Sequence, residues 1–335
     1  MPGSRPPMRT DELDYDLPEA AIAQTPIEPR DAARLLVDRG RTVPVEHRRV
    51  ADLPALVGSG DVIVVNDTRV RRARLWCRKP SGGRVEILLV DDVGGGCWHA
   101  LVRPGRKVRE GDVLTAEIGA VVVRIGADLG GGLRAVEVDG DPEAVGEVPL
   151  PPYIHEPLAD AERYQTVYAR RAGSAAAPTA GLHLTDDVLR RCRDAGAEVV
   201  AVELAVGLDT FRPITTDDVD DHVIHREAYC VPQSTWDACR RATRVLAVGT
   251  TAVRALESAA AFGELEGRTG LFIRPGFEFR VVDRLLTNFH VPRTSLLALI
   301  AAFVGDRWRS LYAEALAEGY RFLSFGDAML LDRAA

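Results

Sequence analysis

The chain is 335 residues long, with 46% hydrophobic and 27% charged residues and a formal net charge of -7. This composition is typical of a soluble globular protein with one large or two ordinary domains, and it excludes a disordered or fibrous chain. The longest apolar run, residues 296–304, is too short to cross a bilayer, and the first 15 residues lack the apolar core of a secretory signal. We therefore expect a cytoplasmic protein without membrane contact.

The cysteines point to the same compartment. All five are scattered, and none forms a Cys-x-x-Cys pair: Cys77, Cys97, Cys192, Cys230 and Cys239. An odd, unpatterned set argues for a reducing environment and against structural zinc.

Positive charge is concentrated between Arg69 and Arg109, where eleven basic residues accompany three acidic ones. This span therefore carries +8, and the remainder of the chain carries -15. A basic segment on an acidic protein can bind phosphate groups, as in RNA. Solvated strand faces would give the same pattern, and charge alone does not separate the two.

The first elements in chain order are strands. Residues 34–37 resemble a strand, and residues 61–65 form the continuous apolar run of a strand covered on both faces. This second run leads into Asn66, Asp67, Thr68 and Arg69. Polar side chains at the end of a buried strand often contact a ligand in α/β folds. A turn in which the first two side chains bond their own backbone is the alternative.

Between residues 74 and 146 the pattern changes to short strands without an intervening helix. Glycine-rich turns separate five such runs, which are residues 85–90, 97–102, 113–118, 121–125 and 133–138. Closely spaced short strands predict a small antiparallel β-barrel. Because the α/β pattern resumes afterwards, we predict a discontinuous α/β domain of residues 1–68 and 150–335, interrupted by a barrel domain at residues 69–149.

The segment after the barrel contains a candidate binding turn. A helix is predicted over residues 160–172, which include Tyr168, and a second helix over residues 186–195. Just before the second helix stand Thr179, Gly181 and His183. A glycine here permits close approach of a ligand, and a neighbouring histidine can change its charge near neutral pH. A tight turn with a surface histidine is the alternative.

Two further buried strands are predicted, over residues 198–206 and 244–248. The second leads into a helix through a junction that carries Gly249, Thr250, Thr251, Arg254 and Glu257. A strand–Gly–Thr–helix junction offers backbone N–H groups to an anion. The arginine and the glutamate, three residues apart on the helix, could equally form a surface ion pair.

Several familiar catalytic patterns do not occur. The sequence has no Gly-x-Gly-x-x-Gly after a strand, no P-loop, no His-Glu-x-x-His and no Gly-x-Ser-x-Gly. His222 and His225 stand three apart, but without a clear third ligand they do not favour a metal site.

The order of these motifs resembles the S-adenosylmethionine:tRNA ribosyltransferase-isomerase family of queuosine biosynthesis, over residues 14–331. The resemblance rests on residues 23–31, 66–70, 146–154, 164–168, 176–184, 249–257, 287–292 and 320–329. The fold that it implies, an α/β domain interrupted by a small β-barrel, agrees with the pattern of strands.

The resemblance implies an unusual reaction. The family transfers the ribosyl group of S-adenosylmethionine to the aminomethyl-deazaguanine (preQ1) base of tRNA and isomerises it, giving epoxyqueuosine-tRNA and releasing adenine and methionine. S-adenosylmethionine is then a substrate, preQ1-bearing tRNA is the partner, and no cofactor or metal is expected; we expect a monomer. A proton next to the sulfonium must be removed and the departing adenine stabilised, which acid/base and polar groups can do.

The resemblance also assigns site residues. We expect His183, His290 and Asp67 to be catalytic. Substrate contacts are expected from Thr68, Arg69, Tyr168, Thr179, Gly181, Gly207, Thr250, Thr251, Arg254, Glu257, Gly276, Asn288 and Asp327. Contacts to tRNA phosphates are expected from Arg71, Arg72, Arg103, Arg106 and Lys107.

Two of these expectations are specific. Arg254 should meet the methionine carboxylate through bidentate hydrogen bonds. The other concerns one pocket at the ends of strands, where clefts form in α/β sheets. It should combine Thr179, Gly181, His183, Asn288 and His290, with Thr250 and Arg254 on its rim.

The chain departs from the family at one motif. Where a pattern like Leu-His-Val-Gly-Ala-Gly-Thr-Phe is expected, alanine stands at Ala205 in place of histidine and aspartate at Asp209 in place of the second glycine. The neighbouring Gly207, Thr210 and Phe211 are retained. Two alternatives therefore remain: an enzyme that uses S-adenosylmethionine on another acceptor, or an inactive RNA-binding protein.

Overall fold

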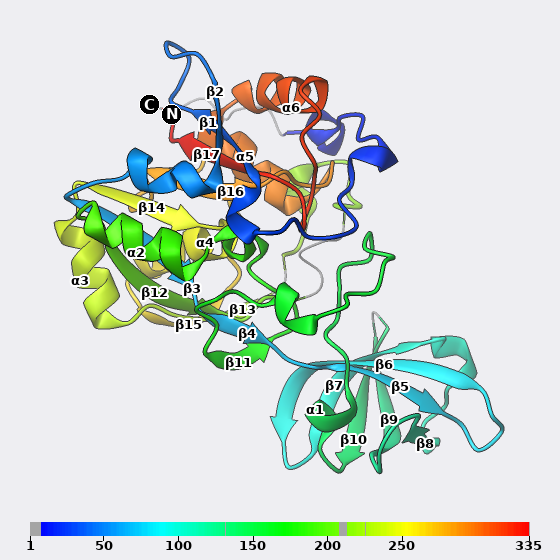
Figure 1. Ribbon diagram of the computed structural model, residues 1–335. Coiled ribbons are helices and arrows are strands. Elements are labelled where there is room, and N and C mark those ends of the chain that lie inside the picture. Colours follow the sequence, from blue (N-terminus) through cyan, green and yellow to red (C-terminus); the bar gives the residue numbers. More distant parts are fainter. Residues whose placement is uncertain (1–7, 131, 208–212, 225, 335) are drawn as a thin grey trace, which may run out of the picture. The chain divides into compact units, whose positions relative to one another are not determined.

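The computed structural model describes residues 8–130, 132–207, 213–224 and 226–334. They form two compact units (Figure 1). The first comprises the described residues of Met1–Arg69, Pro151–Arg171 and Ala177–Ala335, and the second those of Val70–Leu150 and Ala172–Ala176. The first unit is mixed α/β and the second contains a closed antiparallel barrel. The predicted fold class is therefore confirmed.

A nine-stranded sheet forms the centre of the α/β unit. Its four neighbouring parallel strands are β12 (Glu198–Leu204), β3 (Asp61–Asn66), β14 (Arg244–Val248) and β16 (Arg284–Asn288). All residues of β3 are buried, as its continuous apolar run predicts. The sheet continues on one side through β13 (Glu227–Cys230) and β15 (Glu266–Thr269), and on the other through β17 (Ala328–Asp332), β1 (Arg34–Asp38) and β2 (Glu46–Arg49).

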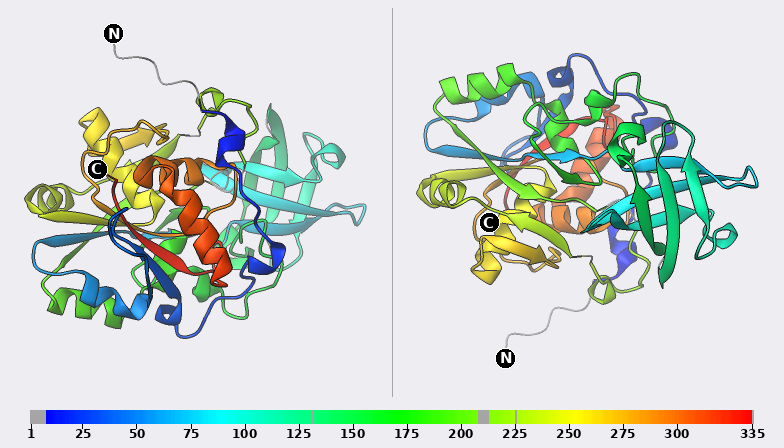
Figure 2. Two further views of the ribbon diagram at one scale, coloured as in Figure 1. Left: turned by 90° about the horizontal axis from the view of Figure 1, so that it is seen from above. Right: turned by 90° about the horizontal axis from the view of Figure 1, so that it is seen from below.

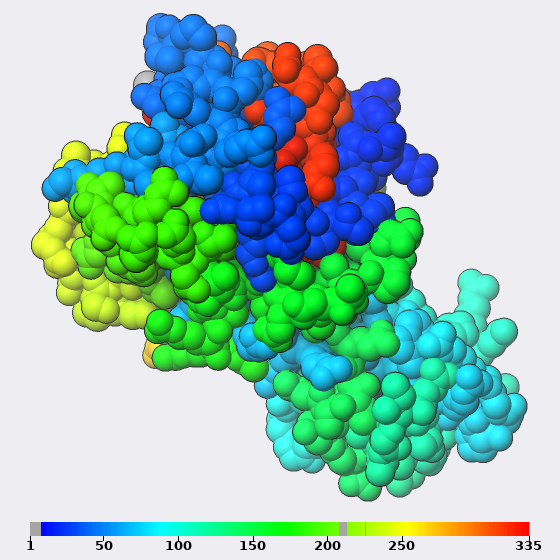
Figure 3. All heavy atoms as spheres, viewed as in Figure 1, coloured from blue at the N-terminus to red at the C-terminus, as the bar shows by residue number. Residues whose placement is uncertain are grey.

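Helical segments cover both faces of this sheet (Figures 1 and 2). On one face, α2 (Asp186–Asp194) packs beside the 3₁₀ segment η4 (Val50–Leu56), and the two form a closed layer in the space-filling view (Figure 3). The other face carries α4 (Thr250–Phe262) and α5 (Ser295–Val304). The remaining longer helices are α3 (Gln233–Arg241) and α6 (Arg307–Ala317).

Helix α2 begins where the sequence predicts because Thr185 caps it. The Thr185 hydroxyl accepts a hydrogen bond from the Val188 N–H at 3.1 Å. Asp186 and Asp187 occupy the first turn and arginines the last, which suits the helix dipole.

The second unit is a closed barrel of six antiparallel strands. They are β5 (Arg74–Arg78), β6 (Arg84–Gly94), β7 (Cys97–Arg103), β8 (Val113–Ala116), β9 (Val122–Gly130) and β10 (Leu133–Asp139). Residues 70–150 include twelve basic and twelve acidic residues. Acidic residues beyond Arg109 therefore offset the charge of the basic span, and the barrel unit as a whole is not basic.

The helix predicted over residues 160–172 is wrong. A short 3₁₀ segment, η6 (Ala161–Tyr164), is followed by irregular chain and then by β11 (Arg171–Ser174), which pairs with β4 (Thr68–Val70). Tyr164, Gln165 and Thr166 are all buried in succession. Three consecutive buried side chains do not lie on one face of a helix, so the segment is held in an irregular conformation instead.

Short segments complete the structure. They are η1 (Thr10–Leu13), η2 (Glu19–Ala21), η3 (Arg30–Ala32), η5 (Gly105–Lys107), α1 (Pro142–Val145), η7 (Thr179–His183) and η9 (Val219–Asp221). Among the described residues, no helix is both long enough and apolar enough to cross a membrane.

Candidate active site

The candidate site lies at the edge of the sheet where the parallel strands end. A cavity of about 430 Å³ adjoins this edge. Its wall includes Gly207 after β12, Glu227 of β13, and the first turns of α4 with Thr250, Thr251 and Arg254. Loops after the carboxyl ends of parallel strands form ligand clefts in open α/β sheets. The position of the cavity therefore follows from the topology.

Two small cavities adjoin the large one. The first, of about 30 Å³, shares Thr250 and Thr251 with it and reaches Asn288 and His290. The second, of about 20 Å³, shares Thr179, Asn288 and His290 with the first. The predicted residues that line these three cavities are Thr179, Gly207, Thr250, Thr251, Arg254, Asn288 and His290. Those outside their walls are Asp67, Thr68, Arg69, Tyr168, Gly181, His183, Glu257, Gly276 and Asp327.

Asn288 connects two of the predicted clusters. Its Oδ1 accepts a hydrogen bond from the Thr179 hydroxyl at 3.0 Å, and its Nδ2 lies 3.0 Å from Nε2 of His183. Burial, with Arg321, Arg163 and Arg30 nearby, lowers the pKa of His183 to about 3. His183 is therefore a neutral partner that holds Asn288. The expectation that its charge changes near neutral pH is wrong.

His290 lines both small cavities, and the structure fixes its position closely. Its Nε2 lies 2.9 Å from the Thr287 hydroxyl. Its backbone carbonyl accepts from the Tyr15 hydroxyl at 2.6 Å, and its N–H donates to the Tyr312 hydroxyl at 3.0 Å. Burial lowers the pKa of His290 to about 3, so this imidazole is also neutral at physiological pH.

Gly181 is required by packing against a neighbouring tyrosine. A Cβ at this position would stand 1.9 Å from the Tyr168 hydroxyl oxygen and 2.9 Å from Cγ2 of Thr166. The Tyr168 side chain thus fills the space beside Gly181. The expectation that a ligand occupies this space is wrong. The buried Tyr168 hydroxyl has no hydrogen-bond partner among the described residues.

Gly181→Ala is expected to lower the free energy of unfolding by about 1–3 kcal/mol, because the added methyl group overpacks this contact. Tyr168→Phe removes the oxygen that is met first, and it should restore part of that loss in the double variant. Urea denaturation of both single variants and the double variant measures the coupling. Gly105→Ala is the control, since its Cβ would meet no atom within 4 Å; equal losses at both glycines would contradict the packing argument.

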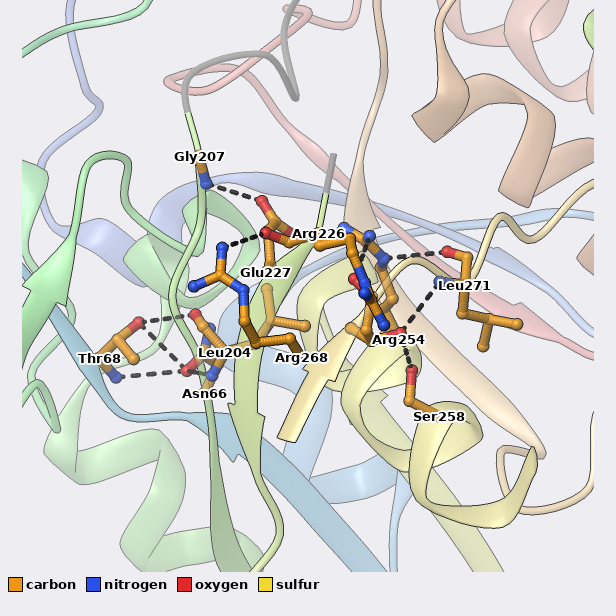
Figure 4. A network of polar contacts seen from close by, with 11 residues as sticks. Asn66, Thr68, Leu204, Gly207, Arg226, Glu227, Arg254, Ser258, Arg268 and Leu271 are labelled. Atoms are coloured by element: carbon orange, nitrogen blue, oxygen red, sulfur yellow. Dashed lines mark hydrogen bonds and ion pairs between the residues drawn. The ribbon is translucent and has the colours of Figure 1, made fainter. Parts of the chain in front are cut away.

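Arg254 is held by an acidic partner that the sequence analysis did not assign to the site (Figure 4). Its Nη1 donates to Glu227, Nε to the Leu271 carbonyl at 3.0 Å, and Nη2 to the Thr269 carbonyl at 3.2 Å. Glu227 also accepts the Gly207 N–H at 2.7 Å. Burial lowers the pKa of Arg254, and Glu227 opposes that shift. Its donors are therefore committed to the protein, which argues against the predicted contact with a methionine carboxylate.

Comparisons with known proteins connect this site to one family. The model of the queuosine biosynthesis protein family matches residues 10–331. The chain belongs to this family. The S-adenosylmethionine:tRNA ribosyltransferase-isomerase of Rubrobacter xylanophilus is 51% identical, over 97% of this chain and 98% of its own. That of Thermus thermophilus is 49% identical, over 95% of this chain and 98% of its own. The resemblance inferred from the sequence is therefore confirmed.

A solved structure supports the same assignment. The crystal structure of S-adenosylmethionine tRNA ribosyltransferase from Thermotoga maritima is 36% identical to this chain and superposes with a TM-score of 0.56. The match covers 95% of this chain and 99% of that one. The mixed α/β fold with its barrel is thus shared with a solved member of the queuosine biosynthesis family.

Three residues expected to contact substrate are held by contacts within the protein. Glu257 is fully buried and accepts hydrogen bonds from the N–H groups of residues 280–282. Asp327 accepts from the N–H groups of Arg34 and Arg321, each at 2.8 Å. The buried Thr68 hydroxyl lies 3.1 Å from Oδ1 of Asn66, which also accepts the Thr68 N–H as in a turn. The alternative of an Arg254–Glu257 surface ion pair is also wrong.

Three other predicted residues lie away from the cavities. Arg69 forms an ion pair with Glu162. Gly276 has a φ of 98° and occupies a turn, which explains the glycine without a ligand. Asp67 is half-buried, and its Oδ1 has no hydrogen-bond partner within the described residues. Burial raises the pKa of Asp67, while Arg171 and Arg170 oppose the shift.

Metal ligands do not gather in the described part of the chain, where no group of three His, Cys, Asp or Glu side chains could hold an ion. His222 lies in the wall of the large cavity. His225 lies outside the described residues, as do Asp209, Thr210 and Phe211 of the divergent motif. Ala205 stands between Leu204 and Gly207, which both line the large cavity, and its N–H donates to the Ala228 carbonyl at 3.0 Å.

The predicted tRNA-binding residues of the barrel unit fall into two groups. Arg71 has acidic neighbours in Asp92 at 3.5 Å and Glu143 at 3.6 Å, and Arg72 donates to the Gly146 carbonyl at 2.8 Å. Arg103, Arg106 and Lys107 are exposed and have no ion pair among the described residues. Arg109 of the basic span is exposed as well, so this second group and Arg109 together offer positive charge to phosphate.

Proposed function

We propose that the chain transfers and isomerises the ribosyl group of S-adenosylmethionine onto the preQ1 base of tRNA, giving epoxyqueuosine-tRNA with release of adenine and methionine. The cavity of about 430 Å³ beside Asn288 and His290 carries the proposal for the S-adenosylmethionine site. The names of the curated relatives support the two substrates. S-adenosylmethionine is then consumed as a substrate, and no further cofactor is used.

The side chains at the small cavities suit the chemistry. The sulfonium acidifies the neighbouring C–H, and His290, which lines both small cavities, is the candidate acceptor of that proton. Its pKa of about 3 makes it a weak base in the free protein, so this role requires that substrate binding raise the pKa of His290. The Thr179 hydroxyl donates to Asn288 and keeps lone pairs for a ribose hydroxyl. Neutral, fixed groups of this kind stabilise developing charge without adding a second cation beside the sulfonium.

Adenine release is the direct test. The protein is incubated with S-adenosylmethionine and either preQ1-bearing tRNA, unmodified tRNA or no tRNA, and adenine and the modified nucleoside are quantified by liquid chromatography and mass spectrometry. We expect adenine and epoxyqueuosine only with preQ1-bearing tRNA. Adenine release with a different acceptor would support the alternative suggested by Ala205. Binding of tRNA without adenine release would support an RNA-binding protein.

The exposed basic group predicts how tRNA binding responds to salt. Charge reversal at Arg103, Arg106 and Lys107 should weaken tRNA binding and reduce its salt dependence, by roughly 0.7–0.9 log units per log unit of salt for each lost phosphate contact. Affinity of the variants for tRNA is measured by filter binding between low and high salt. Binding of S-adenosylmethionine should be unchanged.

Arg124→Glu is the matched control for this charge reversal. Arg124 is also exposed on the barrel. It differs from Arg103, Arg106 and Lys107 because its Nε lies 3.5 Å from the Glu137 carboxylate. Equal losses from both substitutions would show a general charge effect, and no loss from either would place the RNA on another surface.

A further inference from the structure

The first turn of α4 presents unused hydrogen-bond donors to the cavities. Gly249, with a φ of 84°, precedes the helix and has no side chain to cap it. The N–H groups of Thr250, Thr251 and Ala252 have no acceptor among the described residues. The first N–H groups of a helix lack partners within the helix, and its dipole is positive at this end. An anion is the complementary ligand for such a site.

The Thr251 hydroxyl is a second and independent sign of a ligand. The residue is only 9% exposed, and its buried Oγ1 has no hydrogen-bond partner within the described residues. Thr251 lines both the 430 Å³ cavity and the adjoining cavity of about 30 Å³. Its Oγ1 lies 3.6 Å from the position that a Cβ on Gly249 would take, so the hydroxyl points back to the start of the helix. A buried hydroxyl without a partner is costly unless a ligand satisfies it.

The charged side chains near the start of α4 do not prevent a carboxylate from binding there. Arg254 lies one turn further along α4, but its guanidinium is bonded to Glu227 and to two backbone carbonyls. That pair therefore contributes little net charge to the cavity wall. Within the described residues, the N–H groups of the helix start and the buried Thr251 hydroxyl stand at these cavities without a hydrogen-bond partner.

We propose that the start of α4, with the Thr251 hydroxyl, binds the amino-acid carboxylate of S-adenosylmethionine, in place of Arg254. This inference rests on the proposed function, since it assigns one end of that substrate. The carboxylate accepts from the free backbone N–H groups and from Thr251, while the sulfonium and ribose extend through the cavities along the Thr250–His290 wall.

Calorimetric titration of the full chain with two ligands tests the assignment. S-adenosylmethionine is compared with its decarboxylated analogue, which keeps the nucleoside, the sulfonium and the amine but lacks the carboxylate. The wild-type protein should bind the analogue at least about tenfold more weakly, the worth of one hydrogen bond to a charged group. Thr251→Val should weaken S-adenosylmethionine binding about tenfold and leave affinity for the analogue unchanged.

The melting temperature of the free variant distinguishes a ligand contact from a structural one. Thr251→Val keeps the shape of the side chain and removes an unpaired hydroxyl, so it should not lower the melting temperature. Thr235→Val is the control, because this buried threonine of α3 donates to the Ala201 carbonyl at 2.7 Å and lines none of the three cavities. It should lower the melting temperature without changing the ratio of the two affinities.

Two results would overturn the assignment while leaving the proposed function intact. One is equal affinity of the wild-type protein for both ligands, and the other is an equal loss of both affinities in Thr251→Val. A wild-type protein that binds neither ligand would overturn the proposed function itself, and the carboxylate site with it.

Discussion

His290→Gln is expected to lower the turnover of S-adenosylmethionine by about 10²–10⁴-fold, the usual contribution of a general acid or base. His290 lines both small cavities next to the large one, whereas His183 lines none of the three. Glutamine keeps an amide that can bond the Thr287 hydroxyl, but it cannot take up a proton. Single-turnover release of adenine with preQ1-bearing tRNA measures the effect. The KM for S-adenosylmethionine should change little.

His183→Gln is the matched comparison. Among the described residues, the 3.0 Å contact with Asn288 connects His183 to the site, so it is a positioning residue. An amide at position 183 can still accept from Asn288, and turnover should fall by about tenfold or less. Equal losses in the two variants, or the larger loss at position 183, would transfer the proton-transfer role to His183. An alanine at this buried position would also destabilise the fold, so it does not separate the two roles.

The parts of the structure that the sequence predicted best depend on local pattern. The continuous apolar run of β3 indicates a central strand because a strand covered on both faces has no polar side to show. The start of α2 can be predicted from sequence because the capping Thr185 and the two aspartates that favour a helix N-terminus all stand within its first turn. The place of Asn288 and His290 was predictable because β16 ends at the edge of the sheet where clefts form, and η7 brings Thr179 to the same edge.

The parts that were missed depend on contacts between residues distant in sequence. Arg254 was expected to meet a substrate carboxylate, with an ion pair to Glu257 as the alternative, but its actual partner Glu227 precedes it by 27 residues. Gly181 suggested room for a ligand, whereas the space is filled by Tyr168, which the sequence cannot place against it. Burial lowers the pKa of His183 and so keeps its imidazole neutral. The local sequence does not indicate that this side chain is buried.

Acid is expected to destabilise the protein through both buried histidines. Each has a folded-state pKa of about 3, against about 6.5 in an unfolded chain. Above about pH 6.5 both states are neutral, and the stability from burying neutral imidazole is fully present. As the pH falls from 6.5 towards 3, the unfolded state binds protons that the folded state does not. The free energy of unfolding should therefore fall with a slope that increases below pH 6.5 and approaches about 1.4 kcal/mol per pH unit for each histidine below about pH 5.5.

Urea denaturation at several pH values between 7 and 5 measures this slope. His290→Gln removes one of the two titrating groups, so the slope should become shallower by about 1 kcal/mol per pH unit on average over this range, and by about 1.4 kcal/mol per pH unit at its acid end. His99→Gln is the control, because the His99 side chain is 41% exposed on β7 and gains little from folding in its neutral form. The slope of this control should match that of the wild type. If removing His290 left the slope unchanged while removing His99 reduced it, acid sensitivity would come from the surface, and the buried histidines would have to be solvated or charged in the folded protein.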